Sequence, residues 1–162
     1  MKKAETNLDA KIINPFLEAA LSVFEQILKT TPERGKIYLE MPPLHGKEVN
    51  AVIGVTGGIS GQVIYCVDTD TSIKLASALM PGMPINTFDE LAQSAIRELG
   101  NMITGNAATR LFENGFSCNL TPPTLFFGKD VFLSTNDRVL VIPLKLPQGE
   151  VTIHVAVKED NK

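Results

Sequence analysis

The feature that most constrains the fold is an internal repetition of helix and strand signals. Residues about 10–80 and about 88–157 each begin with a helical pattern and continue with strand patterns. At 162 residues with 44% hydrophobic side chains, the chain is long enough for one domain with its own core. We therefore predict a single α+β domain over residues 1–162, a pseudo-two-fold duplicated unit with two long helices packed on a largely antiparallel sheet.

The repetition extends to short stretches of sequence. Pro42-Pro43 in the first half is answered by Pro122-Pro123 in the second, and the run Gly61–Val67 is answered by Gly149–Val155. Because the stretches occur in the same order, we interpret them as remnants of a duplicated unit.

In the first half, Asn14-Pro15 predicts the start of a helix, with Asn as the N-cap and Pro in the first turn. Its apolar stripe is formed by Leu17, Leu21, Phe24 and Leu28. The Thr56-Gly57-Gly58 turn predicts a hairpin, and Pro81-Gly82 ends a short helix that Asp68 to Asp70 can cap. The strands are predicted within Lys36–Met41, His45–Val55 and Gly61–Val67, and in the second half around Val131, in Arg138–Lys145 and in Gly149–Val157.

A long helix is predicted from Asp89 to a break near Asn114-Gly115. At about 100° per residue, half of its circumference is apolar and faces a core. That half consists of Leu91, Ala95, Ile96, Leu99, Met102, Ile103 and Ala107. The opposite arc carries the polar residues Ser94, Glu98 and Asn101, with the small residues Gly105 and Ala108 beside them. Glycines inside a helix each cost about 1 kcal/mol relative to Ala, so Gly100 and Gly105 suggest that another protein approaches the helix closely.

The charge distribution argues against several classes of partner. The formal net charge is -3, and no run of Lys or Arg could follow a phosphate backbone. No segment approaches the roughly 18 apolar residues of a membrane span, and no signal peptide is recognisable. We therefore predict a cytoplasmic protein that binds neither nucleic acid nor a membrane.

The cysteines and histidines do not indicate a metal site. Cys66 and Cys118 do not form a CxxC pair, and His45 and His154 have no metal-ligand spacing with other donors. We predict reduced cysteines, structural or exposed histidines, and no metal ligands.

The polar arc of the second long helix resembles the motif of the chemotaxis phosphatases of the CheC, CheX and FliY class, most closely of its CheX members. Ser94, Glu98 and Asn101 follow one another at intervals of four and three residues, and Pro122-Pro123 lies downstream. The first helix keeps Glu18 at the position of Glu98, but it has Leu21 at the position of Asn101. This arrangement, with the motif in the second half alone, resembles the CheX members. Arg97 departs from the resemblance, which implies a small residue before the Glu.

The resemblance implies hydrolysis of the aspartyl phosphate of a phosphorylated CheY-type response regulator. Asn101 and Glu98 are then the catalytic residues: Asn101 positions the attacking water, and Glu98 pairs with the lysine of the receiver domain. Ser94, Arg97 and Gly105 are the partner-binding residues. No cofactor of its own is implied, because the receiver domain supplies the Mg²⁺.

Other interpretations stay open. From spacing alone, a Glu and an Asn one turn apart usually belong to a solvated face. The alternative function is a non-catalytic module that binds a response regulator or a flagellar-switch protein, and a third is a structural protein that shares only the fold. The resemblance also implies a homodimer joined through its sheets, and the strand-rich tail Val139–Val157 is predicted to offer the pairing edge. The sequence names neither the receiver nor the signalling output.

Overall fold

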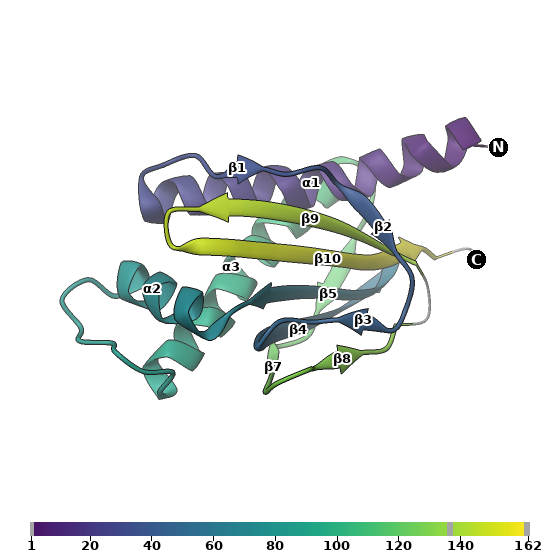
Figure 1. The fold of residues 1–162 in the computed structure, drawn as a ribbon. Coiled ribbons are helices and arrows are strands. Elements are labelled where there is room, and N and C mark those ends of the chain that lie inside the picture. The colour runs from purple at the N-terminus through teal and green to yellow at the C-terminus, as the bar shows by residue number, and fades with distance from the viewer. Residues whose placement is uncertain (1, 136–137, 161–162) are drawn as a thin grey trace.

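The structure is a computed structural model that describes residues 2–135 and 138–160, with side chains from residue 10 onward. Two long helices and one short helix occur in this part of the chain. They are α1 (Lys2–Leu28), α2 (Thr69–Leu79) and α3 (Glu90–Glu113). The two long helices pack against each other on one face of a sheet, which confirms the predicted α+β class (Figure 1).

In the described part of the chain, the main sheet has eight strands, and all of its paired strands are antiparallel. Its main order is β1-β9-β10-β5-β4-β6, with β2 also paired to β9 and β7 also paired to β4. The strands are β1 (Glu33–Arg34), β2 (Tyr38–Glu40), β4 (Val49–Gly57), β5 (Ile59–Val67), β6 (Cys118–Leu120), β7 (Thr124–Phe127), β9 (Val139–Leu146) and β10 (Gly149–Glu159). A separate two-stranded ribbon joins β3 (Leu44–His45) to β8 (Phe132–Leu133).

Strand alternation divides the core into two layers. Val63, Tyr65 and Val67 of β5 belong to the main core, which the sheet shares with the long helices. Ile64 and Cys66 of the same strand point to the opposite face, where they pack with Leu44 of the β3–β8 ribbon. We call this second face, directed away from α1 and α3, the outer face.

The predicted start of the first helix at Asn14-Pro15 is wrong, because α1 extends from Lys2 and contains Pro15 in its interior. A proline has no amide proton to donate to the carbonyl four residues earlier, here that of Lys11. The Asn114 side-chain amide, at the end of α3, donates to the Lys11 carbonyl oxygen at 3.3 Å instead. A side chain distant in sequence therefore satisfies the acceptor that Pro15 leaves free.

The order of strands also corrects the predicted pairing edge at Val139–Val157. β10 lies in the middle of the sheet between β9 and β5, and β9 is covered by β1 and β2. The apolar alternation in this tail reports which face of each strand is buried, and it does not indicate whether the strand lies at an edge of the sheet. The outermost strands of the sheet are instead β1 and β2 on one side and β6 and β7 on the other (Figure 1).

Each half of the chain contributes a long helix, a central hairpin and short outer strands. The β4–β5 hairpin belongs to residues 10–80 and the β9–β10 hairpin to residues 88–157, and the two meet through β5 and β10. Each helix is followed by strands that pair with the hairpin of the other half, β1 and β2 with β9, and β6 and β7 with β4. The duplication itself stays a prediction.

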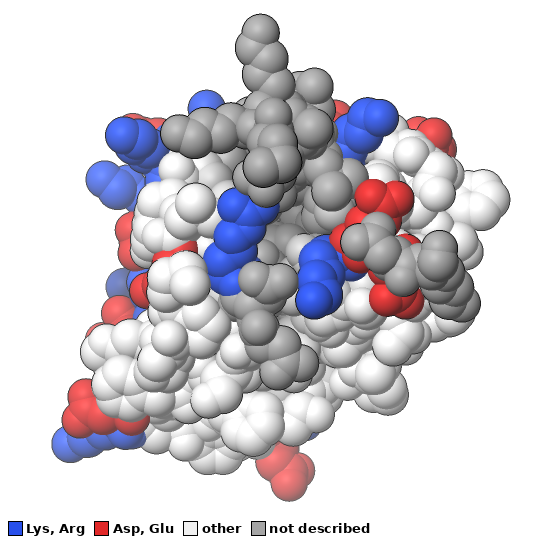
Figure 2. All heavy atoms as spheres, turned by 90° about the vertical axis from the view of Figure 1, so that its right-hand side faces the viewer, with Lys and Arg blue, Asp and Glu red and all other residues white. Residues whose placement is uncertain are grey.

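No helix in the described part of the chain is long and apolar enough to cross a membrane. On the face shown in Figure 2, basic and acidic side chains are interspersed and lie among uncharged surface.

Candidate functional site

Helix α3 is held at both ends by groups that suit its termini. The Asp89 side chain caps it by accepting a hydrogen bond from the Ala92 amide at 2.9 Å. Glu90 in the first turn and Arg110 in the last turn match the polarity of the helix dipole. The helix ends at Asn114 and Gly115, where Gly115 has a φ of 93°. The predicted boundaries of this helix are confirmed.

The polar arc of α3 faces away from the sheet. Ser94, Glu98 and Asn101 are exposed, and within the described residues their side chains make no hydrogen bond or ion pair. Arg97 and Gly105 are half-buried at the borders of this arc. The structure therefore brings the five predicted site residues to one helix face and leaves its carboxylate and carboxamide available to another molecule.

The apolar arc packs as predicted at most positions but not at Leu91. Ala95, Ile96, Leu99, Ile103 and Ala107 are buried, and Met102 is half-buried. Leu91 is 37% exposed. At 100° per residue Leu91 lies only about 20° around the helix axis from Glu98, so it belongs to the rim of the exposed arc rather than to the core face.

A buried polar contact between residues distant in sequence fixes the middle of α3 to the sheet. The Thr104 hydroxyl donates to the Gly100 carbonyl oxygen at 2.7 Å and lies 2.6 Å from the Tyr65 hydroxyl on β5. Because the single Thr104 proton is used, the Tyr65 hydroxyl is the donor in the second bond. Burial raises the pKa of Tyr65 well above its ordinary value, which keeps this donor protonated. The sequence signal for this contact is a polar residue, Thr104, on the side of an amphipathic helix that faces the sheet.

The two glycines of α3 differ in their surroundings. A methyl group added to Gly100 would touch Ile53 and Tyr65 of the sheet at 3.4 and 3.5 Å. A methyl group added to Gly105 would meet nothing within 4 Å. Gly100 is therefore part of the helix–sheet packing, and only Gly105 leaves open space on the side from which a partner could approach.

The corresponding face of α1 is differently equipped. Glu18 lies at the position of Glu98, but its carboxylate is 3.5 Å from the Arg110 guanidinium of α3. Leu21, at the position of Asn101, is half-buried and packs against the main core. At the two positions that match Glu98 and Asn101, α1 therefore has a paired carboxylate and no carboxamide.

A second group of titratable residues lies on the outer face. His154 of β10 is 4% exposed, and its Nδ1 is 3.5 Å from Oε1 of Glu40, too far for a hydrogen bond. Burial, assisted by the charge of Lys47, lowers the pKa of His154 to about 4, so this contact is not an ion pair at neutral pH. Burial also raises the pKa of the nearby Cys66 thiol to about 12. Both groups are thus kept uncharged and unreactive.

Neither cysteines nor histidines assemble a metal site in the described residues. Within residues 2–135 and 138–160, no three His, Cys, Asp or Glu side chains could together hold an ion. Cys66 and Cys118 are free thiols, and His45 stacks on Phe132 with ring centroids 4.7 Å apart.

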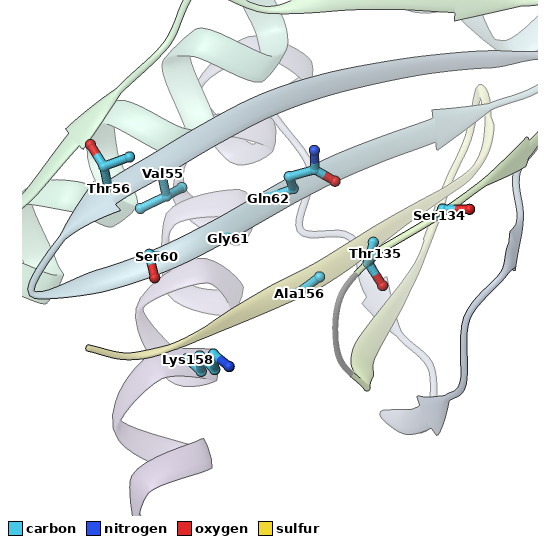
Figure 3. Close-up of a pocket in the computed structure, with 9 residues that line it drawn as sticks. All are labelled: Val55, Thr56, Ser60, Gly61, Gln62, Ser134, Thr135, Ala156 and Lys158. Carbon is cyan, nitrogen blue, oxygen red and sulfur yellow. The ribbon is translucent and has the colours of Figure 1, made fainter. Parts of the chain in front are cut away.

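A shallow pocket of about 390 Å³ lies on the outer face and is separate from α3. Ser60, Gln62, Ala156 and Lys158 line it from β5 and β10, and Ser134 and Thr135 border it (Figure 3). The sheet separates these residues from Glu98 and Asn101, so the pocket does not extend the α3 site.

The geometry of α3 can be compared with known proteins. A family model described as chemotaxis phosphatase CheX matches residues 49–145, which include α3. The chain is also 35% identical, over 156 residues, to the CheY-P phosphatase CheX of Thermotoga maritima. That alignment covers 93% of this chain and 98% of the relative.

Two solved structures are similar over nearly the whole chain. The CheX of the CheX-CheY-BeF3-Mg²⁺ complex from Borrelia burgdorferi superimposes with a TM-score of 0.75 at 30% identity, covering 91% of this chain and 98% of that one. A chemotaxis protein CheX from Desulfovibrio desulfuricans superimposes with a TM-score of 0.81 at 26% identity, covering 92% and 99%.

Proposed function

Since the chain belongs to the CheX family of chemotaxis phosphatases, we propose that it removes the phosphoryl group from a phosphorylated CheY-type response regulator. The observation that carries the proposal is the exposed pair Glu98 and Asn101 on α3, free of partners within the described residues. Two similar proteins support it: the relative from Thermotoga maritima is a CheY-P phosphatase, and the CheX from Borrelia burgdorferi was solved in complex with CheY.

Asn101 is the catalytic residue that positions water. A carboxamide carries both a donor and an acceptor, so it can hold a water in line with the phosphorus atom of an acyl phosphate. The water then attacks phosphorus, the bond to the aspartyl oxygen breaks, and inorganic phosphate leaves. A carboxylate at this position would bring negative charge towards the phosphoryl oxygens and oppose docking.

Glu98 fixes the position of the receiver domain. Its carboxylate lies one turn before Asn101 and is exposed, so it can form a charge-assisted hydrogen bond with the ammonium group of a receiver lysine. Ser94, Arg97 and Gly105 border this pair and contact the receiver around it. The chain needs no metal of its own, because the Mg²⁺ that neutralises the phosphoryl charge belongs to the receiver.

The test compares two asparagines of the same helix. Asn101→Ala should slow the loss of phosphate from a phosphorylated CheY-type receiver about 10²-fold, equivalent to about 2.7 kcal/mol. Asn106→Ala is the matched control, since Asn106 is half-buried and its side chain accepts a hydrogen bond from Arg110 at 2.8 Å. This variant should keep the wild-type rate.

Phosphate release from a panel of phosphorylated receivers measures both variants. Full activity of Asn101→Ala would contradict the catalytic role. A wild-type protein that binds the receiver but leaves the lifetime of its acyl phosphate unchanged or prolonged would instead indicate a non-catalytic binding module.

We also propose that the protein is a homodimer that acts in the cytoplasm. The outer strands β2 and β7 carry exposed apolar residues, among them Leu39 and Phe126. Unpaired strand edges of this kind can be covered by a second copy of the sheet. Light scattering at micromolar concentration should give the mass of a dimer, and a monomer mass would contradict this part of the proposal.

A further inference from the structure

The exposed face of α3 extends well beyond the proposed catalytic pair. Residues separated alternately by three and four positions form a continuous band along one face of a helix. On α3 this band, which we call the α3 stripe, consists of Leu91, Ser94, Glu98, Asn101, Gly105, Ala108 and Phe112. Its middle is small or polar, whereas a large apolar side chain stands at each end.

Phe112, near the end of α3, is unusually exposed for an aromatic side chain. It is 70% exposed, more than any other described phenylalanine. The core position at this end of the helix is taken by the neighbouring Leu111, which is 1% exposed, and Phe116 closes the core after the helix. A large aromatic ring in water contributes little to the stability of its own domain, but it can bury considerable area against a partner.

The length of the α3 stripe matches the width of a protein interface. A standard interface covers about 800 Å² on each partner, which corresponds to a disc with a radius of about 16 Å. Leu91 and Phe112 lie ten and eleven residues from Asn101, or about 15 and 16 Å along the helix at 1.5 Å per residue. A receiver centred on Asn101 would therefore just reach both apolar ends.

We propose that the receiver domain docks along the whole α3 stripe, with Phe112 as its main apolar anchor and Leu91 as a smaller one. The inference rests on the proposed function, which supplies the occupant of the face, and it adds the residues that set affinity. On the receiver, Phe112 would contact an exposed apolar side chain about 16 Å from the acyl phosphate. Phe112 is a binding residue and takes no part in the chemistry.

The experiment separates binding from turnover. A CheY-type receiver carrying beryllofluoride and Mg²⁺ is titrated to obtain Kd, and the phosphorylated receiver is used for kcat and KM. Phe112→Ser should raise Kd and KM about 10-fold and leave kcat within about 2-fold, because a rim contact acts equally on the ground state and the transition state. Leu91→Ser should raise Kd about 3-fold, since its side chain is the less exposed of the two.

Two variants serve as controls. Phe112→Leu keeps an apolar side chain and should remain within about 3-fold of the wild-type Kd. Phe132→Ser removes a phenylalanine that is 60% exposed on β8, outside the α3 stripe, and should not change Kd.

Unchanged Kd and KM for Phe112→Ser would overturn the inference. It would also be overturned if Phe112→Ser altered the oligomeric mass in light scattering and not the affinity, because the occupant would then be a second copy of this chain. The proposed function is judged separately by Asn101→Ala, which should lose kcat at an unchanged Kd for the beryllofluoride form.

Discussion

The two long helices lie in the same layer and differ in what they offer to another molecule. On α3, Glu98 and Asn101 are exposed and unpaired within the described residues. On α1, the matching carboxylate of Glu18 is held near Arg110, and Leu21 replaces the carboxamide. The comparison teaches that a repeated carboxylate does not make a repeated site, because its availability depends on what the neighbouring helix places beside it.

The two helices are also attached to the sheet by different chemistry. When the two halves are aligned by the matching stretches given above, Phe24 of α1 corresponds to Thr104 of α3, and Ile153 of β10 corresponds to Tyr65 of β5. Phe24 and Ile153 are both fully buried and apolar, whereas Thr104 and Tyr65 are joined by a hydrogen bond of 2.6 Å. A hydrogen bond is directional, so it fixes both the rotation of α3 about its axis and the position of α3 on the sheet. The apolar packing of α1 has no such directional contact at the matching position.

Substitutions at Phe24 and Thr104 test whether the two helices are attached differently. Phe24→Ala should lower the free energy of unfolding by about 3–5 kcal/mol, because it empties a fully buried aromatic site. Thr104→Val should lower it by about 1–3 kcal/mol, since the buried Tyr65 hydroxyl loses its partner. Urea denaturation measures both, and a Thr104→Val variant as stable as the wild type would remove the distinction between the two helices.

Substitutions at Glu98 and Glu18 test which of the two carboxylates contacts the receiver. Glu98→Gln should lower kcat/KM for the phosphorylated receiver about 10-fold to 100-fold, the range expected for one hydrogen bond between charged groups. Glu18→Gln breaks only an ion pair with a largely exposed carboxylate and should leave kcat/KM unchanged. Equal losses in the two variants would mean that both helices contact the receiver.

A third prediction concerns Cys66 and His154, which match each other in the two halves. Burial holds the pKa of His154 at about 4, so the folded state binds this proton less readily than the unfolded state. The stabilisation contributed by neutral His154 should therefore be complete above pH 6.5 and be lost as the pH falls towards 4. Between pH 7 and pH 5 we expect a loss on the order of 2 kcal/mol.

The same denaturation series with His154→Gln isolates this contribution. Burial raises the pKa of Glu40, which lies beside His154. The contribution of Glu40 to the free energy of unfolding therefore decreases as the pH rises, whereas that of His154 increases. His154→Gln should flatten the difference between pH 7 and pH 5, whereas Cys66→Ser should keep it. An unaltered acid-induced loss in His154→Gln would show that other groups cause it.

The smallest effect distinguishes the two glycines of α3. Gly100→Ala and Gly105→Ala should each raise the free energy of unfolding by up to about 1 kcal/mol, because both positions accept a methyl group without a close contact. Gly105→Ala alone should weaken binding of the receiver, since only Gly105 faces open space. Kd for the beryllofluoride receiver decides this, and an equal change for Gly100→Ala would contradict the assignment of Gly105 to the interface.

Much of the fold was accessible from local patterns. The boundaries of α3 followed from the Asp89 cap and the Asn114-Gly115 break, and the β4–β5 hairpin followed from the Thr56-Gly57-Gly58 turn between apolar runs. The start of α1 was mispredicted because Pro15 is a strong local signal that a distant donor, Asn114, overrides. The Val139–Val157 tail was mispredicted as an edge because strand alternation reports which face is buried and says nothing about lateral neighbours.

The sequence predicted which residues of α3 form the candidate site, but it did not predict the contacts that hold α3 against the sheet. Spacing alone placed Ser94, Glu98 and Asn101 on one face, because the helical period fixes which side chains share a side. The anchoring bond between Thr104 and Tyr65 joins residues 39 apart in sequence, and no short pattern encodes such a contact.

Local sequence patterns were sufficient to predict the α+β class, the amphipathic period of α3 and the order of its polar residues, since these depend on interactions within a few residues. Long-range packing pairs Glu18, leaves Glu98 unpaired among the described residues, encloses Pro15 in a helix, and leaves Leu91 and Phe112 exposed at the ends of the α3 stripe. Those outcomes depend on how whole helices and strands pack, which places residues of opposite halves side by side.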